Sequence, residues 1–441
     1  MKILKYKTII FVAFLSLFVS CEKDFTNGNK ANEDQVLSSK EGLIALTLGL
    51  SQNFATSTLA PIIEIPALST RELGNLSTYL TPSELVLGGT GLPDDNAGLT
   101  RLWSRLSRDK KVAEDIMNNV DGVTMEPGTA SGMKAYAKFF KAMLLGYQLQ
   151  SFEKAPINSQ EDGQAVFSDR DALLTECISL LESAKSDITT TPISSEFDTV
   201  IDGIDLPNTI SAFLARYNLI AGNFQDAITA ANAVDLTSKS VWKYEGSNEN
   251  PIWKFAVNGD VDTKPQDNFG LTGSYLPEAG DGRIDYYLAP STDAETDYGL
   301  HGVEDLFGFF STASSSIPVY LPGEMLLIKA EAYAMQDDLP NAVTQLNLVR
   351  GKTDDIFGVN AALGAWTGDT TNKSDILDEI YKNRCIELFM TGMRLEDSRR
   401  IHSSFVPENA GSYTSERNRN YYPYPYEEKA NNTNCPADPS I

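Results

Sequence analysis

The segment 211–235 constrains the fold more than any other part of the chain, because it alternates helical runs with a sharp break. Ala212-Phe213-Leu214-Ala215 opens an apolar helical pattern, Gly222-Asn223 interrupts it, and Ala227-Ile228-Thr229-Ala230-Ala231 begins a second one. Small side chains on both runs allow two antiparallel helices to approach closely. The segment therefore predicts a helical hairpin.

The small residues of this hairpin stand where a tetratricopeptide unit has them. A second unit lies at 325–350, with Ala330 and Tyr333 in its first helix and Ala342 in its second, and 133–188 supplies two more degenerate units. Any single helical hairpin would show one such pattern. Several in series favour stacked tetratricopeptide-like repeats that form a right-handed superhelix.

Helices are also predicted at 41–54 and 102–120, where apolar residues recur every three or four positions. The chain is therefore expected to be mainly α. We expect residues 41–441 to form a single globular domain.

Two long segments, 71–100 and 236–322, lack the helical period and are rich in Gly, Pro, Asn and Asp. We expect them to be long irregular loops, since a structureless segment of this length in a compact domain is usually functional. A few short strands are predicted inside the second loop, at Val241–Tyr244 and Pro251–Phe255. A further irregular segment is expected at 354–372, and the C-terminal tail has no helical period.

The N-terminus has the pattern of a secretory signal. Three lysines precede an apolar run, Ile9–Val19, which is too short to span a bilayer as a helix. Ser20 before Cys21 suits a lipoprotein cleavage site, so we predict a signal peptide over 1–20, lipidation of Cys21 and a tether to residue 40. The alternative is an ordinary secreted protein whose signal ends near a cysteine. Lipidation would anchor the protein to a membrane without spanning it.

The chain is strongly acidic, with a formal net charge of −24 that becomes −27 once the three signal-peptide lysines are removed. Nucleic acid is therefore excluded as a partner, because phosphate binding needs a basic face. An anionic membrane surface is disfavoured for the same reason, so membrane attachment is expected to come from the lipid.

No catalytic constellation is recognisable. The two histidines, His301 and His402, lie far apart, and no HExxH, GxSxG or P-loop pattern is present. The acidic pairs Asp94-Asp95, Asp281/Asp285 and Glu304-Asp305 are those that a glycosidase would need, but acids are abundant here and a solvated surface is the simpler interpretation. Asp260, Asp262 and Asp267 offer oxygen ligands for Ca²⁺ without an EF-hand pattern. An exported location permits a Cys385–Cys435 disulfide, and Cys177 is expected to pack as a small apolar residue.

Charged residues near the C-terminus recur at three- and four-residue steps or their sums. On one helix or two, such steps allow a ladder of ion pairs and hydrogen bonds. Gly392 within the ladder marks a break or a close approach of two backbones. We expect the ladder to tie the last helices to the irregular region; its members are Arg384, Glu387, Arg394, Asp397 and Arg400.

The same stretch resembles a motif of the SusD/RagB-like nutrient-binding lipoproteins of the Bacteroidetes outer membrane. It reads Arg384-x-x-Glu387-Leu388-x-x-x-Gly392-x-Arg394-x-x-Asp397-x-x-Arg400. Asn383, Thr391 and Leu395 depart from the family pattern. Residues 321–349 are similar to the family's final helical pair, and Tyr422-Pro423-Tyr424-Pro425 is similar to its C-terminal signature. Glu22-Lys23-Asp24 resembles the signal that sends such lipoproteins to the cell surface.

This resemblance implies a role. Family members act as lids on SusC-like TonB-dependent transporters, capture an oligosaccharide or a peptide, and have no catalytic activity. By resemblance, the chain is expected in the outer membrane, lipid-anchored and facing the cell exterior. The helical repeats would face the transporter, and the irregular loops would hold the ligand. A different class of function also stays open, namely a lipid-anchored helical-repeat scaffold without a small ligand.

Carbohydrate binding favours flat aromatic faces together with amides, acids and arginines for the sugar hydroxyls. The irregular loops supply such residues, whereas Trp103, Trp242 and Trp253 occupy regular positions and are expected in the core. Tyr287 and Tyr298 belong to the same aromatic-rich insertion. The candidate ligand-binding residues are Arg71, Glu72, Asn75, Tyr79, Asn268, Tyr275, Asp281 and Tyr286.

Overall fold

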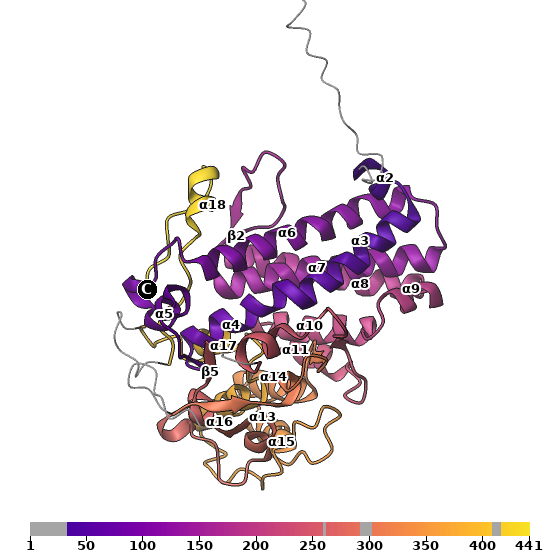
Figure 1. Ribbon diagram of the computed structural model, residues 1–441. Coiled ribbons are helices and arrows are strands. Elements are labelled where there is room, and N and C mark those ends of the chain that lie inside the picture. Colours follow the sequence, from indigo (N-terminus) through magenta and orange to yellow (C-terminus); the bar gives the residue numbers. More distant parts are fainter. Residues whose placement is uncertain (1–32, 259–261, 292–301, 408–415) are drawn as a thin grey trace, which may run out of the picture.

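The computed structural model describes residues 33–258, 262–291, 302–407 and 416–441, and these form a mainly helical fold (Figure 1). Four long helices lie side by side in one half of the molecule, shown in the upper part of the figure. They are α3 (Lys40–Asn53), α6 (Ala97–Asn119), α7 (Pro127–Ser151) and α8 (Arg170–Thr190). The predicted helices at 41–54, 102–120 and 133–188 are thereby confirmed.

The predicted hairpins are confirmed as well. Helix α10 (Leu206–Ala221) ends at Gly222, whose φ of 80° is left-handed and favours glycine, and α11 (Phe224–Asn232) follows. The later pair is α14 (Pro322–Met335) and α15 (Leu339–Arg350). Helix α8 packs on α10, and α11 packs on α14, so the hairpins stack in chain order. This arrangement is the tetratricopeptide type of helical repeat that the sequence predicts.

Aspartate caps fix where several of these helices begin. The carboxylate of Asp169 accepts a hydrogen bond from the Ala172 amide at 3.0 Å, and that of Asp205 accepts one from the Asn208 amide at 3.2 Å. Each cap satisfies an amide that has no partner inside the helix and places a negative charge at the positive end of the helix dipole.

Helices α3 and α4 (Leu59–Ser69) form one continuous rod that is interrupted by a π-helical turn, η1 (Phe54–Thr58). The buried carboxylate of Asp109 on α6 holds this turn, because it accepts hydrogen bonds from Asn53 Nδ2 and from Thr58 Oγ1, both at 2.6 Å. A polar side chain of α6 therefore sets the register between the rod and the long helices.

Sequence predictions in the irregular segments are wrong at three places, one of which is helix α13 (Gly282–Tyr287) inside the large insertion. Residues 80–87, expected as loop, form helix α5 (Leu80–Leu87), because Leu85 and Val86 are buried against neighbouring helices. Residues 251–255, expected as a strand, form helix α12 (Pro251–Ala256). Asn250 caps α12 by accepting from the amides of Ile252 and Trp253, and Pro251 occupies the first helical position.

The tail also contains a short helix that the sequence did not predict, α18 (Tyr426–Asn431). Residues 354–372 have neither helix nor strand, as predicted. The remaining helices are α2 (Glu33–Leu37), α9 (Ser195–Val200), α13 (Gly282–Tyr287), α16 (Lys373–Glu387) and α17 (Arg394–Ile401), with short turns η2 (Gly89–Gly91), η3 (Val120–Gly122), η4 (Asp267–Gly270), η5 (Gly273–Tyr275) and η7 (Gly308–Phe310).

The strands of the described chain form four antiparallel pairs. β4 (Val241–Trp242) confirms the predicted strand and pairs with β8 (Ile317–Pro318). The pair that matters most for the loops joins β1 (Leu73–Asn75) to β5 (Thr263–Pro265), with Leu73 opposite Pro265. The other two pairs are β2 (Ala155–Pro156) with β3 (Phe167–Ser168) and β6 (Leu288–Pro290) with β7 (Glu304–Leu306).

Aromatic side chains from distant segments fill the core. Trp103 and Trp242 are buried as predicted, whereas Trp253 is only partly buried. Tyr422 and Tyr424 of the C-terminal signature are fully buried. The described cysteines, Cys177, Cys385 and Cys435, are free thiols, so the disulfide that the sequence permits between the last two is not formed. Within the described residues, every helix is too short or too polar to span a bilayer.

The contact between α7 and α10 gives a stability prediction. Gly146 on α7 faces the phenol of Tyr217 on α10 so closely that a Cβ would overlap the ring. Gly146→Ala is expected to lower the free energy of unfolding by about 1–3 kcal/mol, measured by urea denaturation. The control is Gly49→Ala on α3, where a Cβ meets open space and a gain of up to about 1 kcal/mol is expected. Equal effects of the two substitutions would contradict the packing described.

Candidate functional site

The pairing of β1 with β5 brings the first irregular segment against the large insertion. The backbone N–H of Gln266 donates to the backbone carbonyl of Glu72 at 3.0 Å. Gly270 lies so close to the carbonyl of Arg71 that no side chain fits at this position. Arg71 and Asn268 both have a positive φ, of 71° and 53°. Three candidate residues, Arg71, Glu72 and Asn268, thus belong to one locally constrained region.

Glu72 is almost completely buried, with 1% of its surface exposed. Its Oε1 accepts a hydrogen bond from the Met390 amide at 2.9 Å. Burial raises the pKa of this carboxyl above its usual value, although the nearby Arg394 guanidinium acts in the opposite direction. Arg394 also donates to the carbonyl of Phe269, so the ladder residue joins η4 to the start of α17.

Several buried polar atoms around β1 and β5 have no hydrogen-bond partner among the described residues. They are Arg71 Nε, Glu72 Oε2, Thr263 Oγ1 and both polar atoms of the Gln266 side chain. Buried polar groups are nearly always hydrogen-bonded, so such a concentration is typical of places that hold enclosed water.

Tyr275 belongs to a second cluster, built around His402. Its hydroxyl donates to Asp378 Oδ1 at 3.1 Å and lies 3.3 Å from His402 Nε2, and its ring packs edge-on against Tyr381. The other imidazole nitrogen, Nδ1, lies 2.6 Å from Glu416 Oε2. The cluster therefore joins η5, α16, the end of α17 and the segment that begins the C-terminal tail.

The pKa of His402 is raised. Burial by itself lowers it, but the hydrogen bond to Glu416 and the charges of Glu416 and Asp378 outweigh burial. Burial and the adjacent Asp378 raise the pKa of the Tyr275 hydroxyl, so Tyr275 stays neutral and can donate. The cluster is thus an imidazole flanked by two carboxylates that favour its protonated form.

Asp281 and Tyr286 hold the short helix α13 in place. Asp281 is 3% exposed, caps α13 by accepting from the Arg283 amide at 3.1 Å, and pairs with the Arg283 guanidinium at 2.7 Å. Arg283 also reaches Glu387 of α16 at 3.2 Å. The Tyr286 hydroxyl donates to the carbonyl of Phe357 at 2.9 Å. Both candidates therefore connect α13 to its surroundings.

Asn75 and Tyr79 lie beyond the end of β1. The Asn75 side chain is 4% exposed, donates to the Ser77 carbonyl at 3.0 Å and to Ser83 Oγ at 2.8 Å, and accepts from the Ser77 amide. These bonds shape the turn that leads to Tyr79. Tyr79 is 64% exposed and is the one exposed side chain among the eight candidates.

The structure thus separates the eight candidates into groups. Arg71, Glu72 and Asn268 adjoin one another, Asn75 and Tyr79 continue from β1, Asp281 and Tyr286 share α13, and Tyr275 packs in the His402 cluster. Sequence reasoning missed His402, Asp378 and Glu416, because residues so far apart in the chain carry no joint signal. Cys21, Tyr298, His301 and Asp260 lie outside the described residues. No group of three metal-binding side chains occurs among those described, and Asp262 and Asp267 are the described members of the Ca²⁺ prediction.

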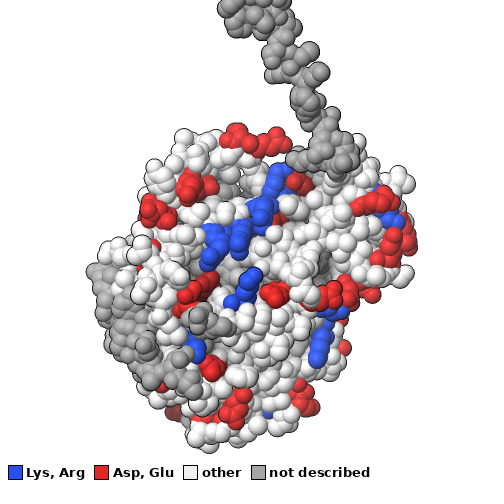
Figure 2. All heavy atoms as spheres, in the orientation of Figure 1, with Lys and Arg blue, Asp and Glu red and all other residues white. Residues whose placement is uncertain are grey.

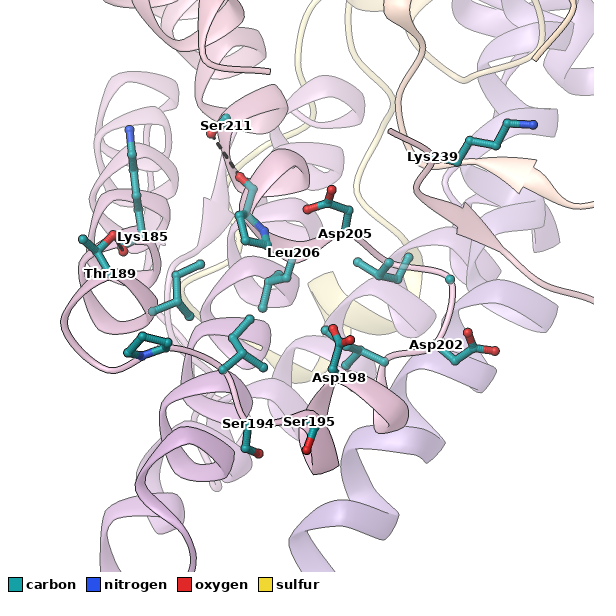
Figure 3. A pocket seen from close by; sticks show the side chains of 17 residues that line it. Lys185, Thr189, Ser194, Ser195, Asp198, Asp202, Asp205, Leu206, Ser211 and Lys239 are labelled. Atoms are coloured by element: carbon teal, nitrogen blue, oxygen red, sulfur yellow. Dashed lines mark hydrogen bonds between the residues drawn. The ribbon is translucent and has the colours of Figure 1, made fainter. Parts of the chain in front are cut away.

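A large open cavity of about 910 Å³ lies elsewhere, between the end of α8, the segment 191–205 and the start of α10 (Figure 3). In the figure, Lys185 and Thr189 stand on the α8 side, and Asp198 and Asp202 stand opposite. Ile188, Ile193 and Leu206 supply apolar surface. None of the eight candidates lines this cavity, so it is separate from the predicted ligand side.

The buried pair formed by Arg283 gives a second stability prediction. Arg283→Met would leave the buried carboxylates of Asp281 and Glu387 without their shared cation, which is expected to cost about 3–5 kcal/mol. The exposed pair Lys243–Asp202 is the control, and Lys243→Met is expected to cost less than about 1 kcal/mol. Urea denaturation measures both; a loss for Arg283→Met as small as the control's would refute the role assigned to this network.

The His402 cluster predicts a pH dependence. Because the pKa of folded His402 exceeds the unfolded value near 6.5, its stabilising contribution is complete below about pH 6.5 and is lost as pH rises through the folded pKa. His402→Gln is expected to remove this part of the decline in unfolding free energy, and Glu416→Gln to shift it to lower pH. NMR titration reads the pKa directly, and His301→Gln assigns the signal because the chain has two histidines. A folded-state pKa below 6.5 would overturn this account.

Comparisons with known proteins agree with the fold. The SusD family model matches residues 309–438, which include the ladder and the C-terminal signature. Among curated proteins, none is significantly similar to this chain in sequence.

Solved structures resemble the chain over nearly its whole length. A SusD superfamily protein from Bacteroides vulgatus ATCC 8482 is 14% identical, with a TM-score of 0.64 and coverage of 92% of this chain and 98% of that one. A protein described as a putative sugar binding protein from the same organism is 17% identical, with a TM-score of 0.67 and coverage of 91% and 98%. B. fragilis NanU is 12% identical, with a TM-score of 0.69 and coverage of 93% and 99%. The chain therefore matches the SusD family model in its C-terminal part and has the fold of these solved structures over nearly its whole length.

Proposed function

We propose that this chain is a non-catalytic, lipid-anchored protein of the outer membrane that binds a nutrient oligosaccharide at the cell surface and delivers it to a SusC-like TonB-dependent transporter. Two structural relatives support the ligand class, since one is described as a putative sugar binding protein and another, from Bacteroides fragilis, as a SusD-like carbohydrate binding protein. Lipidation of Cys21 after removal of residues 1–20 would supply the anchor.

The observation that carries the proposal is the region around β1. It places the exposed ring of Tyr79 just beyond β1, beside the pairing that joins the first irregular segment to the large insertion. An oligosaccharide offers apolar C–H faces to a tyrosine ring. Aromatic side chains commonly line sites for small ligands.

The acidic pairs that a glycosidase would use support binding over catalysis. Asp94 pairs with Lys429 at 2.6 Å, Asp305 with Lys264 at 2.7 Å, and Asp281 with the buried Arg283. These three carboxylates are thus held by cations of the chain itself, whereas both carboxyl groups of a glycosidase must reach the glycosidic bond.

Tyr79 is the residue with which to test the ligand side. Tyr79→Ala is expected to weaken binding of the responding oligosaccharide at least about fivefold, because the ring loses its contact with the sugar face. Calorimetry and affinity electrophoresis against a panel of glycans and peptides measure this. Tyr426→Ala is the matched control, since Tyr426 is 59% exposed on α18 and is expected to have no effect.

The panel also separates the alternatives. If peptides bind and glycans do not, the ligand is a peptide and not an oligosaccharide. The same two tyrosine variants would then show whether the peptide contacts Tyr79. Binding to neither, by a folded protein that co-purifies with another membrane protein, would favour the helical-repeat scaffold. An equal effect of both tyrosine variants would argue against a ligand site beyond β1.

A further inference from the structure

One helix of this acidic chain carries a line of cations. Arg101, Arg105, Arg108 and Lys111 follow one another on α6 at steps of four, three and three residues, which place them on one face of the helix over about 15 Å. We call these four residues the α6 stripe. The side chains of Arg101, Arg108 and Lys111 are 38%, 55% and 42% exposed. Lys and Arg side chains form a line on the face shown in Figure 2, in the region where Figure 1 shows α3 and α6.

Neighbouring acids neutralise the α6 stripe only in part. Arg101 pairs with Glu64 at 2.9 Å, and Lys111 pairs with Asp115 one turn further along α6. Arg108 lies 3.3 Å from Asp109, but Asp109 is buried and already accepts hydrogen bonds from Asn53 and Thr58.

Among the residues that the structure describes, no carboxylate contacts Arg105, and its guanidinium donates to the carbonyl of Ser57. Glu114 and Glu161 also act on Lys111, in addition to Asp115. The positive charge that the α6 stripe keeps is therefore concentrated at Arg105 and Arg108.

The α6 stripe adjoins the end of the chain that carries the predicted lipid. Helix α2 packs on α3 and α6, and Val36 of α2 lines the same groove of about 360 Å³ as Arg108 and Val112. The groove is mostly apolar, with Leu46 and Leu50 of α3 on its wall. Helix α2 begins twelve positions after Cys21, and a chain of that length spans at most about 40 Å.

We propose that the α6 stripe binds phosphate-bearing lipid headgroups of the membrane that holds Cys21, so that this face of the protein rests on the bilayer. The proposal depends on the lipid attachment in the proposed function for its orientation, but not on the identity of the nutrient. It also corrects the expectation that the negative net charge disfavours an anionic membrane surface. Electrostatic attraction is screened beyond about a Debye length, so the cations nearest to the surface decide the interaction. The groove beside Arg108 adds apolar surface to the same face of the protein, and such surface suits the interfacial region of a bilayer.

The test uses the mature chain, residues 21–441, with Cys21→Ser so that no acyl group contributes. It is sedimented with vesicles that contain phosphatidylglycerol and with vesicles of phosphatidylcholine alone. Binding is expected to the anionic vesicles only and to be lost at high salt. Arg108→Gln with Lys111→Gln is expected to weaken this binding roughly 25-fold, since each cation near an anionic surface contributes about a fivefold factor.

The control is Lys185→Gln on α8 with Lys373→Gln on α16. It changes the net charge of the protein by the same amount as the stripe variant and is expected to leave vesicle binding unchanged. Thermal unfolding checks that both double variants fold. No binding to anionic vesicles, or equal loss in both double variants, overturns the proposal. Unchanged vesicle binding by the stripe variant together with loss of co-purification with a transporter would overturn it too, and would assign the α6 stripe to a protein partner. Glycan binding by the stripe variant is expected to match the parent, which separates a failure here from a failure of the proposed function.

Discussion

The irregular half of the molecule depends on the ion pairs that the Glu387 carboxylate forms. This carboxylate is completely buried at the end of α16, and it is bound by Arg283 of α13 and by Lys352, which follows α15. The Glu387 carbonyl also accepts from the Tyr287 hydroxyl at 3.2 Å. A buried carboxylate costs several kcal/mol unless cations and donors compensate it, so these segments must reach Glu387 together. One charge thereby orders two stretches of chain, around α13 and after α15, that have little regular structure of their own.

The same kind of contact continues into the helical repeats. Arg384 of α16 pairs with Asp397 of α17 at 2.8 Å, and Arg400 of α17 pairs with Glu331 of α14. Gly323 of α14 lies directly against the Glu387 side chain, where a Cβ would overlap it. The repeats and the irregular layer are therefore joined by one buried network of charges. Loops held in this way can present a binding surface without losing much conformational entropy when a ligand arrives.

The helical half was predictable because its signals are local. The period of apolar residues, the glycine break at Gly222 and the capping acids all act within a few positions, and α7, α8, α10 and α11 follow from them. The charge ladder was predicted to tie the last helices to the irregular region, and the bonds of Glu387 to Arg283 and of Arg394 to the Phe269 carbonyl confirm this. Gly392, expected at a break or a close approach, has a φ of 80° and packs on the carbonyl of Ile62. Helix α12 was missed because its apolar run fits a strand as well as a helix, and the Asn250 cap decides between them.

The sequence by itself determined the helical hairpins, the ladder and the set of loop residues from which a ligand site would be drawn, since each rests on neighbours in the chain. Only the tertiary structure decided how those loop residues are used. It left Tyr79 exposed, committed Asp281 to a buried ion pair and placed Tyr275 against His402, more than a hundred positions away. It likewise packed α2, the first helix after the predicted lipid site, against α6 and its cations. The physical reason is the same in each case: burial and pairing depend on which segments pack together, and one-dimensional spacing carries no record of contacts across such distances.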